Sequence, residues 1–247
     1  MQRRHLLNPT IPLLPRAPGG ARSKTTKSNA AWLSRQNRDQ FVKQRAGTFR
    51  SRSAFKLLEL DAKFRFLRRG QVVVDLGAAP GGWSEAVLSR LSGPAKEETP
   101  SLSAKIIAVD LLPIIPIPGV DIIQGDFLSP VTQAKLAALL NADSGSRGLV
   151  DVVVSDMCHN ISGNRIRDVE SSLELCSAAF EFARVHLRGV GAGALVMKHF
   201  AHPILDAFRK ERLELSFRKV HYSKPQASRG ESSEGYWVCV GWKGSSL

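Results

Sequence analysis

Cysteine and long apolar runs are scarce in this chain of 247 residues. Its three cysteines, Cys158, Cys176 and Cys239, stand far apart and form no Cys-x-x-Cys pair. A disulfide scaffold and a zinc knuckle are therefore disfavoured, and a reducing compartment is indicated. No stretch approaches the roughly 18 uncharged apolar residues that a membrane-spanning helix requires, so we expect no membrane span. The 43% of hydrophobic residues nevertheless suffices for one sizeable core.

Acidic residues are nearly absent from the first quarter of the chain. Residues 1–69 contain 17 lysines and arginines but three acids, whereas residues 70–247 contain 18 basic and 19 acidic residues. The net charge of +13 is therefore concentrated at one end of the chain. A basic extension on a nearly neutral body predicts a polyanion-binding arm, a targeting segment, or both in succession, and we interpret it as both.

Residues 1–38 are interpreted as the targeting segment. They contain eight lysines and arginines and no acid, and they are rich in Ser, Thr, Leu and Ala, as is typical of an organellar transit peptide. Four prolines between positions 9 and 18 would break a long helix, so only Met1 to Leu7 could form an amphipathic turn. We expect import into the mitochondrial matrix, with a cytoplasmic or nuclear location as the alternative. The other interpretation is a basic tail that binds RNA directly.

Helical and strand patterns alternate from Ser51 onwards. Apolar residues recur at helical spacing over Ser51–Leu67, which predicts an entry helix that packs on the body and keeps its cations available. Further helices are predicted at Ser84–Leu91, Val131–Leu140 and Val169–Leu187. Short runs rich in Val, Ile and Leu predict strands at Val72–Leu76, Ile106–Leu111, Asp121–Ile123, Val150–Ser155 and Ala194–Lys198.

The last two predicted strands, Arg218–Tyr222 and Tyr236–Trp242, have no helix between them and predict a closing hairpin. The other strands consist of residues suited to burial on both faces. They therefore predict an α/β fold, a doubly wound sheet of six or seven strands that is parallel except for its final member, with helices on both faces. Residues 70–247 would form this domain, and residues 92–104 resemble a surface insertion in it.

A glycine-rich segment follows the first predicted strand, with the sequence Asp75-Leu76-Gly77-Ala78-Ala79-Pro80-Gly81-Gly82-Trp83. Ligands of open α/β sheets bind at this edge, where glycines let the backbone approach a cofactor closely. The segment is not a Gly-x-Gly-x-x-Gly motif, and Pro80 removes an N–H group that a phosphate would use. A phosphate-free, cationic cofactor is favoured, and we expect S-adenosyl-L-methionine.

Acidic residues end the next two predicted strands. Asp110 is placed to accept hydrogen bonds from ribose hydroxyls, and Asp126 to take an adenine amino group with Phe127 flanking the ring. A single aspartate at a strand end is usually an ordinary helix cap. Three in register, Asp75, Asp110 and Asp126, indicate a nucleoside site.

Asp156 and Lys198 each follow a strand that we expect at the centre of the sheet. A lysine at the end of a buried strand is costly unless it is paired or neutral. One interpretation is a salt bridge to Asp156. The other is a general base, with its pKa lowered by burial and by nearby cations such as Lys56 and the sulfonium of the cofactor. The residues alone do not decide between them.

The chain resembles the FtsJ-like ribosomal RNA 2′-O-methyltransferases from about Trp32 to Trp242. Besides the glycine-rich segment and the Arg50–Leu57 entry helix, the resemblance rests on Asp110-Leu111-Leu112-Pro113, Gln124-Gly125-Asp126-Phe127, Ser155-Asp156-Met157 with Asn160 and Ser162-Gly163, and Val196-Met197-Lys198. It implies a Rossmann-like class I S-adenosylmethionine-dependent methyltransferase with a seven-stranded, mostly parallel sheet. Where relatives commonly carry Asp-Met-Ala-Pro-Asn, this chain has Asp156-Met157-Cys158-His159-Asn160, which puts the rigidity of that loop in doubt.

The resemblance also implies the site residues. The catalytic residues would be Lys56, Asp156, Lys198 and Glu234, with Glu231 as a weaker candidate for the last position. The cofactor-binding residues would be Asp75, Gly77, Ala79, Pro80, Gly81, Gly82, Trp83, Asp110, Leu111, Asp126, Phe127 and Asp156. Lys198 would take the proton of a ribose 2′-OH during in-line methyl transfer. No metal is expected, because His159, His199 and His202 lack acidic or cysteine partners at ligand spacing.

Residues 39–69 are predicted to contact RNA. Five cations lead toward the expected site and could track phosphates: Lys43, Arg45, Arg50, Arg52 and Lys56. Three aromatic residues are interleaved and could stack on unpaired bases: Trp32, Phe41 and Phe49. The alternative is a solvated helix face.

By analogy with the family, we expect a monomer that methylates a uridine of mitochondrial large-subunit ribosomal RNA within an assembling subunit. Transfer RNA or an RNA cap is the alternative substrate. A ribosome-assembly factor with dispensable catalysis is the rival from another class, and a small-molecule methyltransferase would not need the basic arm.

Overall fold

The computed structural model describes residues 49–92, 104–142, 148–160, 162–228 and 232–244. The expected targeting segment 1–38, the first ten residues of the expected RNA-contacting arm and most of the expected insertion 92–104 lie outside these residues. The elements are α3 (Ser53–Phe64), β1 (Val72–Leu76), α4 (Gly82–Leu91), β2 (Lys105–Asp110), β3 (Asp121–Gln124), α5 (Pro130–Ala142), β4 (Val152–Ser155), α6 (Arg165–His186), β5 (Ala194–Phe200), α7 (Pro203–Phe208), a π-helical turn (Arg209–Leu213), α8 (Glu214–Ser216), β6 (Phe217–Ser223) and β7 (Glu234–Trp242).

Seven strands form one sheet in the order β3-β2-β1-β4-β5-β7-β6. The pairs from β3 to β5 are parallel, and β7 runs antiparallel to both β5 and β6. This confirms the predicted mostly parallel sheet with a reversed final strand. The order reverses between β1 and β4, so the carboxyl ends of these two strands border the crevice in which open α/β sheets bind ligands.

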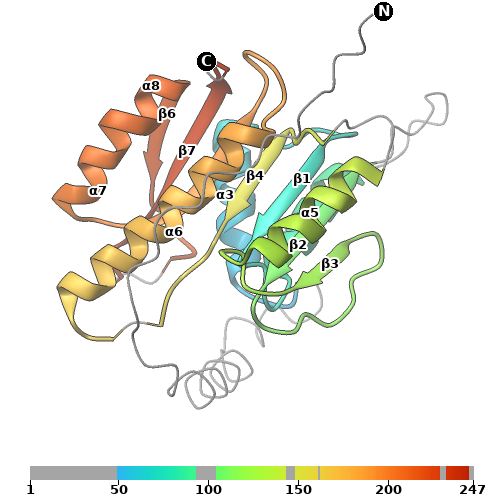
Figure 1. The fold of residues 1–247 in the computed structure, drawn as a ribbon, viewed down its shortest axis with the longest axis horizontal. Helices are drawn as coiled ribbons and strands as arrows, with labels where there is room; N and C mark the ends of the chain where they lie inside the picture. Colours follow the sequence, from blue (N-terminus) through green and yellow to red (C-terminus); the bar gives the residue numbers. More distant parts are fainter. Residues whose placement is uncertain (1–48, 93–103, 143–147, 161, 229–231, 245–247) are drawn as a thin grey trace, which may run out of the picture.

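Helices cover both faces of the sheet. In Figure 1, α5 and α6 lie in front of the sheet and α3 lies behind it. Alternate residues of β1 enter two separate hydrophobic clusters: Val74 packs in the cluster that includes residues of α5 and α6, and Val73 in the cluster that includes residues of α3 and α4. Burial on both faces explains why the strands consist so largely of Val, Ile and Leu.

Most predicted elements differ from the structure by one or two residues at an end, and three differences are larger. The entry helix ends at Phe64, because Arg65 adopts a left-handed conformation (φ 54°) and the Asp61 carboxylate accepts a hydrogen bond from the Leu67 N–H (2.8 Å). Helix α6 begins at Arg165, four residues before the predicted start, with the Asn164 side chain accepting hydrogen bonds from two N–H groups of its first turn. The helical stretch 203–216 was not predicted at all.

None of the helices in the described part of the chain is long and apolar enough to span a membrane.

Candidate active site

The carboxyl ends of β4 and β5 meet the beginning of β7 at one edge of the sheet. The antiparallel register pairs Lys198 with Tyr236 and Phe200 with Glu234, while Asp156 directly follows β4. Helix α3 contributes Lys56 from the face on which it packs. The four residues implied as catalytic, which are up to 178 positions apart in the sequence, therefore lie together.

Lys198 and Asp156 form the first ion pair of this edge. The Lys198 Nζ lies 3.0 Å from the Asp156 Oδ1 and donates a hydrogen bond to the Asp156 main-chain oxygen (2.6 Å). Burial is the largest single influence and lowers the pKa of Lys198, but Asp156, Cys158 and Glu234 together raise it by more, so the amine is held in its ammonium form. Of the two interpretations of Lys198, the salt bridge to Asp156 is present, and the lowered pKa is wrong, because the surrounding acidic groups outweigh burial.

Lys56 and Glu234 form the second ion pair, with 2.6 Å between the Lys56 Nζ and the Glu234 Oε1. The Tyr236 hydroxyl connects the two pairs, because it donates to the Asp156 Oδ1 (2.8 Å) and accepts from the Lys56 Nζ (3.3 Å). Burial is the largest cause that raises the pKa of Tyr236 well above its ordinary value, so the hydroxyl remains a donor. Two lysines, two carboxylates and one phenol thus form a continuous polar cluster.

Tyr236 was missed as a site residue by the sequence analysis. Its position could have indicated a site residue, because the side chain two residues beyond Glu234 on the same strand lies on the same face of the sheet as Glu234. The ring is completely buried, and its centroid lies 5.6 Å from that of Trp83. Its role in the cluster depends on partners from α3 and from the end of β4, which the sequence does not place.

We expect Tyr236→Phe to lower the rate of methyl transfer by up to about thirtyfold, because one hydrogen bond to each ion pair is lost, each worth about 1 kcal/mol. Single-turnover kinetics with saturating cofactor measure the rate. Tyr222→Phe is the matched control: the same atom is removed from the other tyrosine of the chain, which is 56% exposed and has no place in the cluster. Equal rates for Tyr236→Phe and the wild type would contradict the linking role.

The glycine-rich loop leaves no room for side chains where it meets its neighbours. Gly77 has a φ of 76°, and a Cβ at this position would lie 2.8 Å from the Cα of Met157. Gly81 has a φ of 113°, and a Cβ there would lie 2.8 Å from the Cδ1 of Ile117. Larger residues would strain the backbone or displace the loop that follows Asp156, so the glycines maintain the shape of this edge.

Two of the strand-end aspartates border this loop. Asp75 is completely buried; its Oδ2 accepts a hydrogen bond from the Ser84 Oγ (2.6 Å), while its Oδ1 has no partner among the described residues. Burial raises its pKa to about 7. Asp110 accepts hydrogen bonds from the N–H groups of Ala79 and Leu112, both at 2.8 Å. Burial raises the pKa of Asp110 as well.

The other residues predicted to bind the cofactor differ in their exposure: some are exposed and others are buried in the core. Asp126 is exposed and accepts a hydrogen bond from the Leu128 N–H (3.0 Å), and Leu111 is 57% exposed. Trp83 is buried, and its indole N–H donates to the Ser53 main-chain oxygen (2.8 Å), so it anchors α3. Phe127 packs in the core, with its ring centroid 5.7 Å from that of Phe182. Little of the Phe127 ring is thus exposed, and its contact with an adenine stays a prediction.

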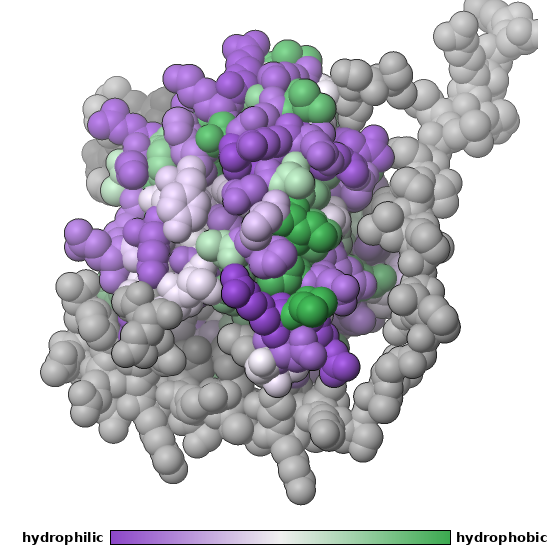
Figure 2. All heavy atoms as spheres, turned by 90° about the vertical axis from the view of Figure 1, so that its left-hand side faces the viewer, coloured by the Kyte–Doolittle hydropathy of each residue, from purple (hydrophilic) through white to green (hydrophobic). Residues whose placement is uncertain are grey.

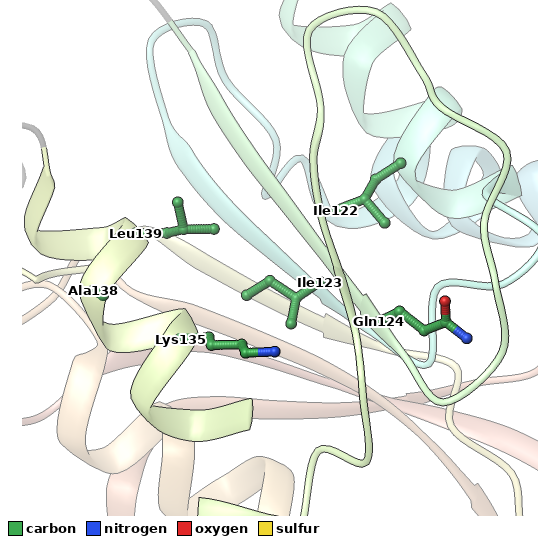
Figure 3. A pocket seen from close by; sticks show the side chains of 6 residues that line it. All are labelled: Ile122, Ile123, Gln124, Lys135, Ala138 and Leu139. Carbon is green, nitrogen blue, oxygen red and sulfur yellow. The ribbon is translucent and has the colours of Figure 1, made fainter. Parts of the chain in front are cut away.

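A separate cavity of about 440 Å³ lies between β3 and α5, away from the polar cluster (Figure 3). Ile123 points from the strand toward the helix there. The lining residues are Ile122, Ile123, Gln124, Lys135, Ala138 and Leu139. None of them was predicted as a site residue.

The described residues contain no group of three or more His, Cys, Asp or Glu side chains that could hold a metal ion.

A doubly wound sheet with a reversed β7, a glycine loop after β1 and acidic residues at successive strand ends define a Rossmann-like methyltransferase. Residues 49–242 match the family model of the FtsJ-like methyltransferases, and the chain belongs to this family.

The relatives agree with this assignment. The chain is 43% identical over 231 residues to a protein of Methylibium petroleiphilum named ribosomal RNA large subunit methyltransferase E, covering 90% of this chain and 98% of the relative. A protein of the same name from Thiobacillus denitrificans is 40% identical over 214 residues, covering 86% and 90%. A crystal structure described as a ribosomal RNA methyltransferase from Plasmodium falciparum is similar with a TM-score of 0.66 and 29% identity, covering 79% of this chain and all of that one.

The cofactor of this methyltransferase is S-adenosyl-L-methionine. The residues present fit it, because the buried Asp75 offers an unpaired carboxylate oxygen to a positively charged group, and Gly77 and Gly81 give the loop after β1 a backbone shape that larger residues would strain. Asp75, Asp110 and the loop 77–82 would hold it. When bound, it supplies an electrophilic methyl group on a sulfonium.

Proposed function

We propose that this protein transfers a methyl group to a ribose 2′-oxygen of large-subunit ribosomal RNA. The observation that carries the proposal is the polar cluster of Lys198, Asp156, Tyr236, Lys56 and Glu234 beside the glycine loop. A buried amine at such an edge provides a base for a hydroxyl of ordinary acidity, which a nitrogen nucleophile with a free lone pair would not need. The names of the relatives support ribosomal RNA as the substrate.

In this proposal Lys198 reacts from its neutral form. As the 2′-oxygen forms its bond to the methyl carbon, the Lys198 Nζ takes the hydroxyl proton, which contributes about 10²- to 10⁴-fold to the rate. Asp156 orients the amine through the contact at 3.0 Å. Lys56, neutralised by Glu234 and joined to Asp156 through the Tyr236 hydroxyl, holds that carboxylate in place. Alignment of oxygen, carbon and sulfur supplies the larger part of the rate.

We further propose a uridine within the assembling large subunit of the mitochondrial ribosome as the target, and a monomer as the active form. The basic segment 1–38, which has no acidic residue, supports mitochondrial import. The cations Arg50 and Arg52 support RNA binding next to the cluster, although both also brace the fold: Arg50 pairs with Glu85 (2.7 Å), and Arg52 donates to the Ala227 oxygen (2.8 Å).

The test is to map 2′-O-methylated positions in mitochondrial ribosomal and transfer RNA from cells with and without the protein. We expect one uridine of the large-subunit RNA to lose its methyl group. Re-expression of the wild type should restore the mark. If ribosomal RNA kept all its marks and transfer RNA lost one, the substrate would be transfer RNA instead. If an inactive variant restored ribosome assembly, the assembly-factor alternative would be favoured.

A further inference from the structure

The first turn of α6 carries two arginines on either side of an exposed isoleucine. Arg165, Ile166 and Arg167 are all exposed, and Ile166 is 72% exposed. Among the described residues, neither arginine side chain has an ion pair or a hydrogen bond. Seven other arginines do have such partners: Arg50, Arg52, Arg90, Arg184, Arg188, Arg209 and Arg212.

The position of these cations opposes the electrostatics of the helix. The N-terminal end of a helix carries a partial positive charge, so each added cation there costs about 0.3–1 kcal/mol instead of stabilising it. Asp168 is the acid of this turn, but its carboxylate accepts hydrogen bonds from the Ser162 N–H (2.8 Å) and hydroxyl (2.7 Å). The two arginines therefore do not serve the stability of α6, and such conflicts with local preference mark functional positions.

The start of α6 is tied to the edge of the sheet that bears Lys198. The loop from Asp156 to Asn164 leads directly into the helix, as Figure 1 shows at the lower left. His159 in this loop packs edge-to-face on Phe200, with ring centroids 6.2 Å apart, and its Nε2 lies 3.3 Å from the Asp168 Oδ1. Phe200 belongs to the same strand as Lys198, so the arginines have a defined place relative to the catalytic amine.

The arginines lie on the opposite face of the sheet from Lys56. Helix α3, which bears Lys56, packs in one hydrophobic cluster, and α6 packs in the other. The end of the molecule that carries α7 and the start of α6 faces the viewer in Figure 2, where hydrophobic residues gather beside strongly hydrophilic ones. A chain of phosphates that crosses the edge of the sheet at Lys198 would therefore meet cations on both sides.

We infer that Arg165, Ile166 and Arg167 form a contact surface for the RNA strand on the α6 side of the catalytic cluster. The two guanidinium groups bind phosphates of nucleotides that flank the methylated ribose, and Ile166 packs against a sugar or base between them. This inference rests on the proposed function and adds to it the part of the chain that holds the flanking RNA.

The experiment compares the full-length wild type with the double variant Arg165→Ala/Arg167→Ala. A fluorescein-labelled stem–loop of the large-subunit RNA is titrated by anisotropy at several salt concentrations, and methyl transfer is measured at saturating cofactor. We expect the Kd for RNA to rise about tenfold and the slope of log K against log salt to fall by about 1.4, as for two lost phosphate contacts on a single strand. KM for RNA should rise in parallel, while kcat and the Kd for the cofactor stay unchanged.

Two control variants make the result specific. Arg218→Ala removes an exposed cation beside Gly191 and Gly241, at the opposite edge of the sheet, and should leave the RNA affinity unchanged. Arg165→Lys/Arg167→Lys should restore most of the affinity. Unaltered affinity and salt slope in the double alanine variant, or an equal loss in Arg218→Ala, would overturn the inference. A wild type that binds this RNA but never methylates RNA would instead refute the proposed function.

Discussion

Lys198→Ala is expected to abolish methyl transfer while the affinity for S-adenosyl-L-methionine stays unchanged. The variant removes the amine that lies 3.0 Å from the Asp156 carboxylate, and with it the group that takes the hydroxyl proton. The rate of a single turnover should fall about 10²- to 10⁴-fold. Calorimetric titration with the cofactor checks binding, and incorporation of labelled methyl groups into RNA checks transfer. Wild-type turnover by this variant would remove the lysine from the reaction.

Lys198→Arg separates proton removal from charge. Arginine keeps a cation beside Asp156 but cannot lose its proton at accessible pH, so this variant should be about as inactive as Lys198→Ala. Retained activity in Lys198→Arg would show that the lysine acts by its charge alone.

The wild-type rate should also rise with pH, about tenfold per unit above neutrality, because Asp156 raises the pKa of Lys198 and leaves little of the neutral amine.

Asp75→Asn is expected to stabilise the protein without ligands at alkaline pH. The pKa of Asp75 is about 7 in the folded protein and about 3.8 in an unfolded chain. Between these values the folded protein holds a proton that the unfolded chain has lost, so the free energy of unfolding falls as the pH rises from about 4 to about 7. The fall amounts to at most about 4 kcal/mol and then levels off. Asparagine has no proton to lose, so the variant should not show it.

Urea unfolding at pH 5 and pH 8 measures this difference. The wild type should lose stability between the two values, and Asp75→Asn should lose less, so that the variant is about 1–3 kcal/mol more stable at pH 8. Asp121→Asn is the control, because Asp121 is an exposed aspartate on the edge strand β3. The same pH dependence in the wild type and in Asp75→Asn would show that the buried carboxyl group does not titrate in this range.

Much of the fold could be predicted because the central strands are buried on both faces. Runs such as Val72–Leu76 contain mainly residues that tolerate such burial, and polar residues such as Asp110 and Asp156 lie at or just after the carboxyl ends of other strands. The stretch 203–216 escaped prediction because it is divided into a short helix, a π-helical turn and a single further turn, none of which is long enough for a helical period.

The candidate site likewise has residues that could be predicted from the sequence and one that could not. Lys198 and Asp156 follow directly from the ends of two strands, and Lys56 and Glu234 from the family resemblance. Tyr236 could not be assigned, because its hydroxyl bonds to groups 80 and 180 positions away, and these contacts depend on packing between elements. The direction of the Lys198 pKa depends on a balance between burial and the acidic groups around the amine, which are Asp156, Cys158 and Glu234, and their positions follow only from the folded structure.

Strand β7 makes the active site dependent on how the end of the chain is aligned. Lys198 faces Tyr236 through a ladder that also sets Phe200 opposite Glu234. A shift of this ladder by a single position would turn Tyr236 and Glu234 to the other face, leaving the amine without its neighbours although the core remained largely apolar. The catalytic centre therefore needs β7 seated between β5 and β6, and a chain that lacks this strand would carry the glycine loop without Tyr236 and Glu234.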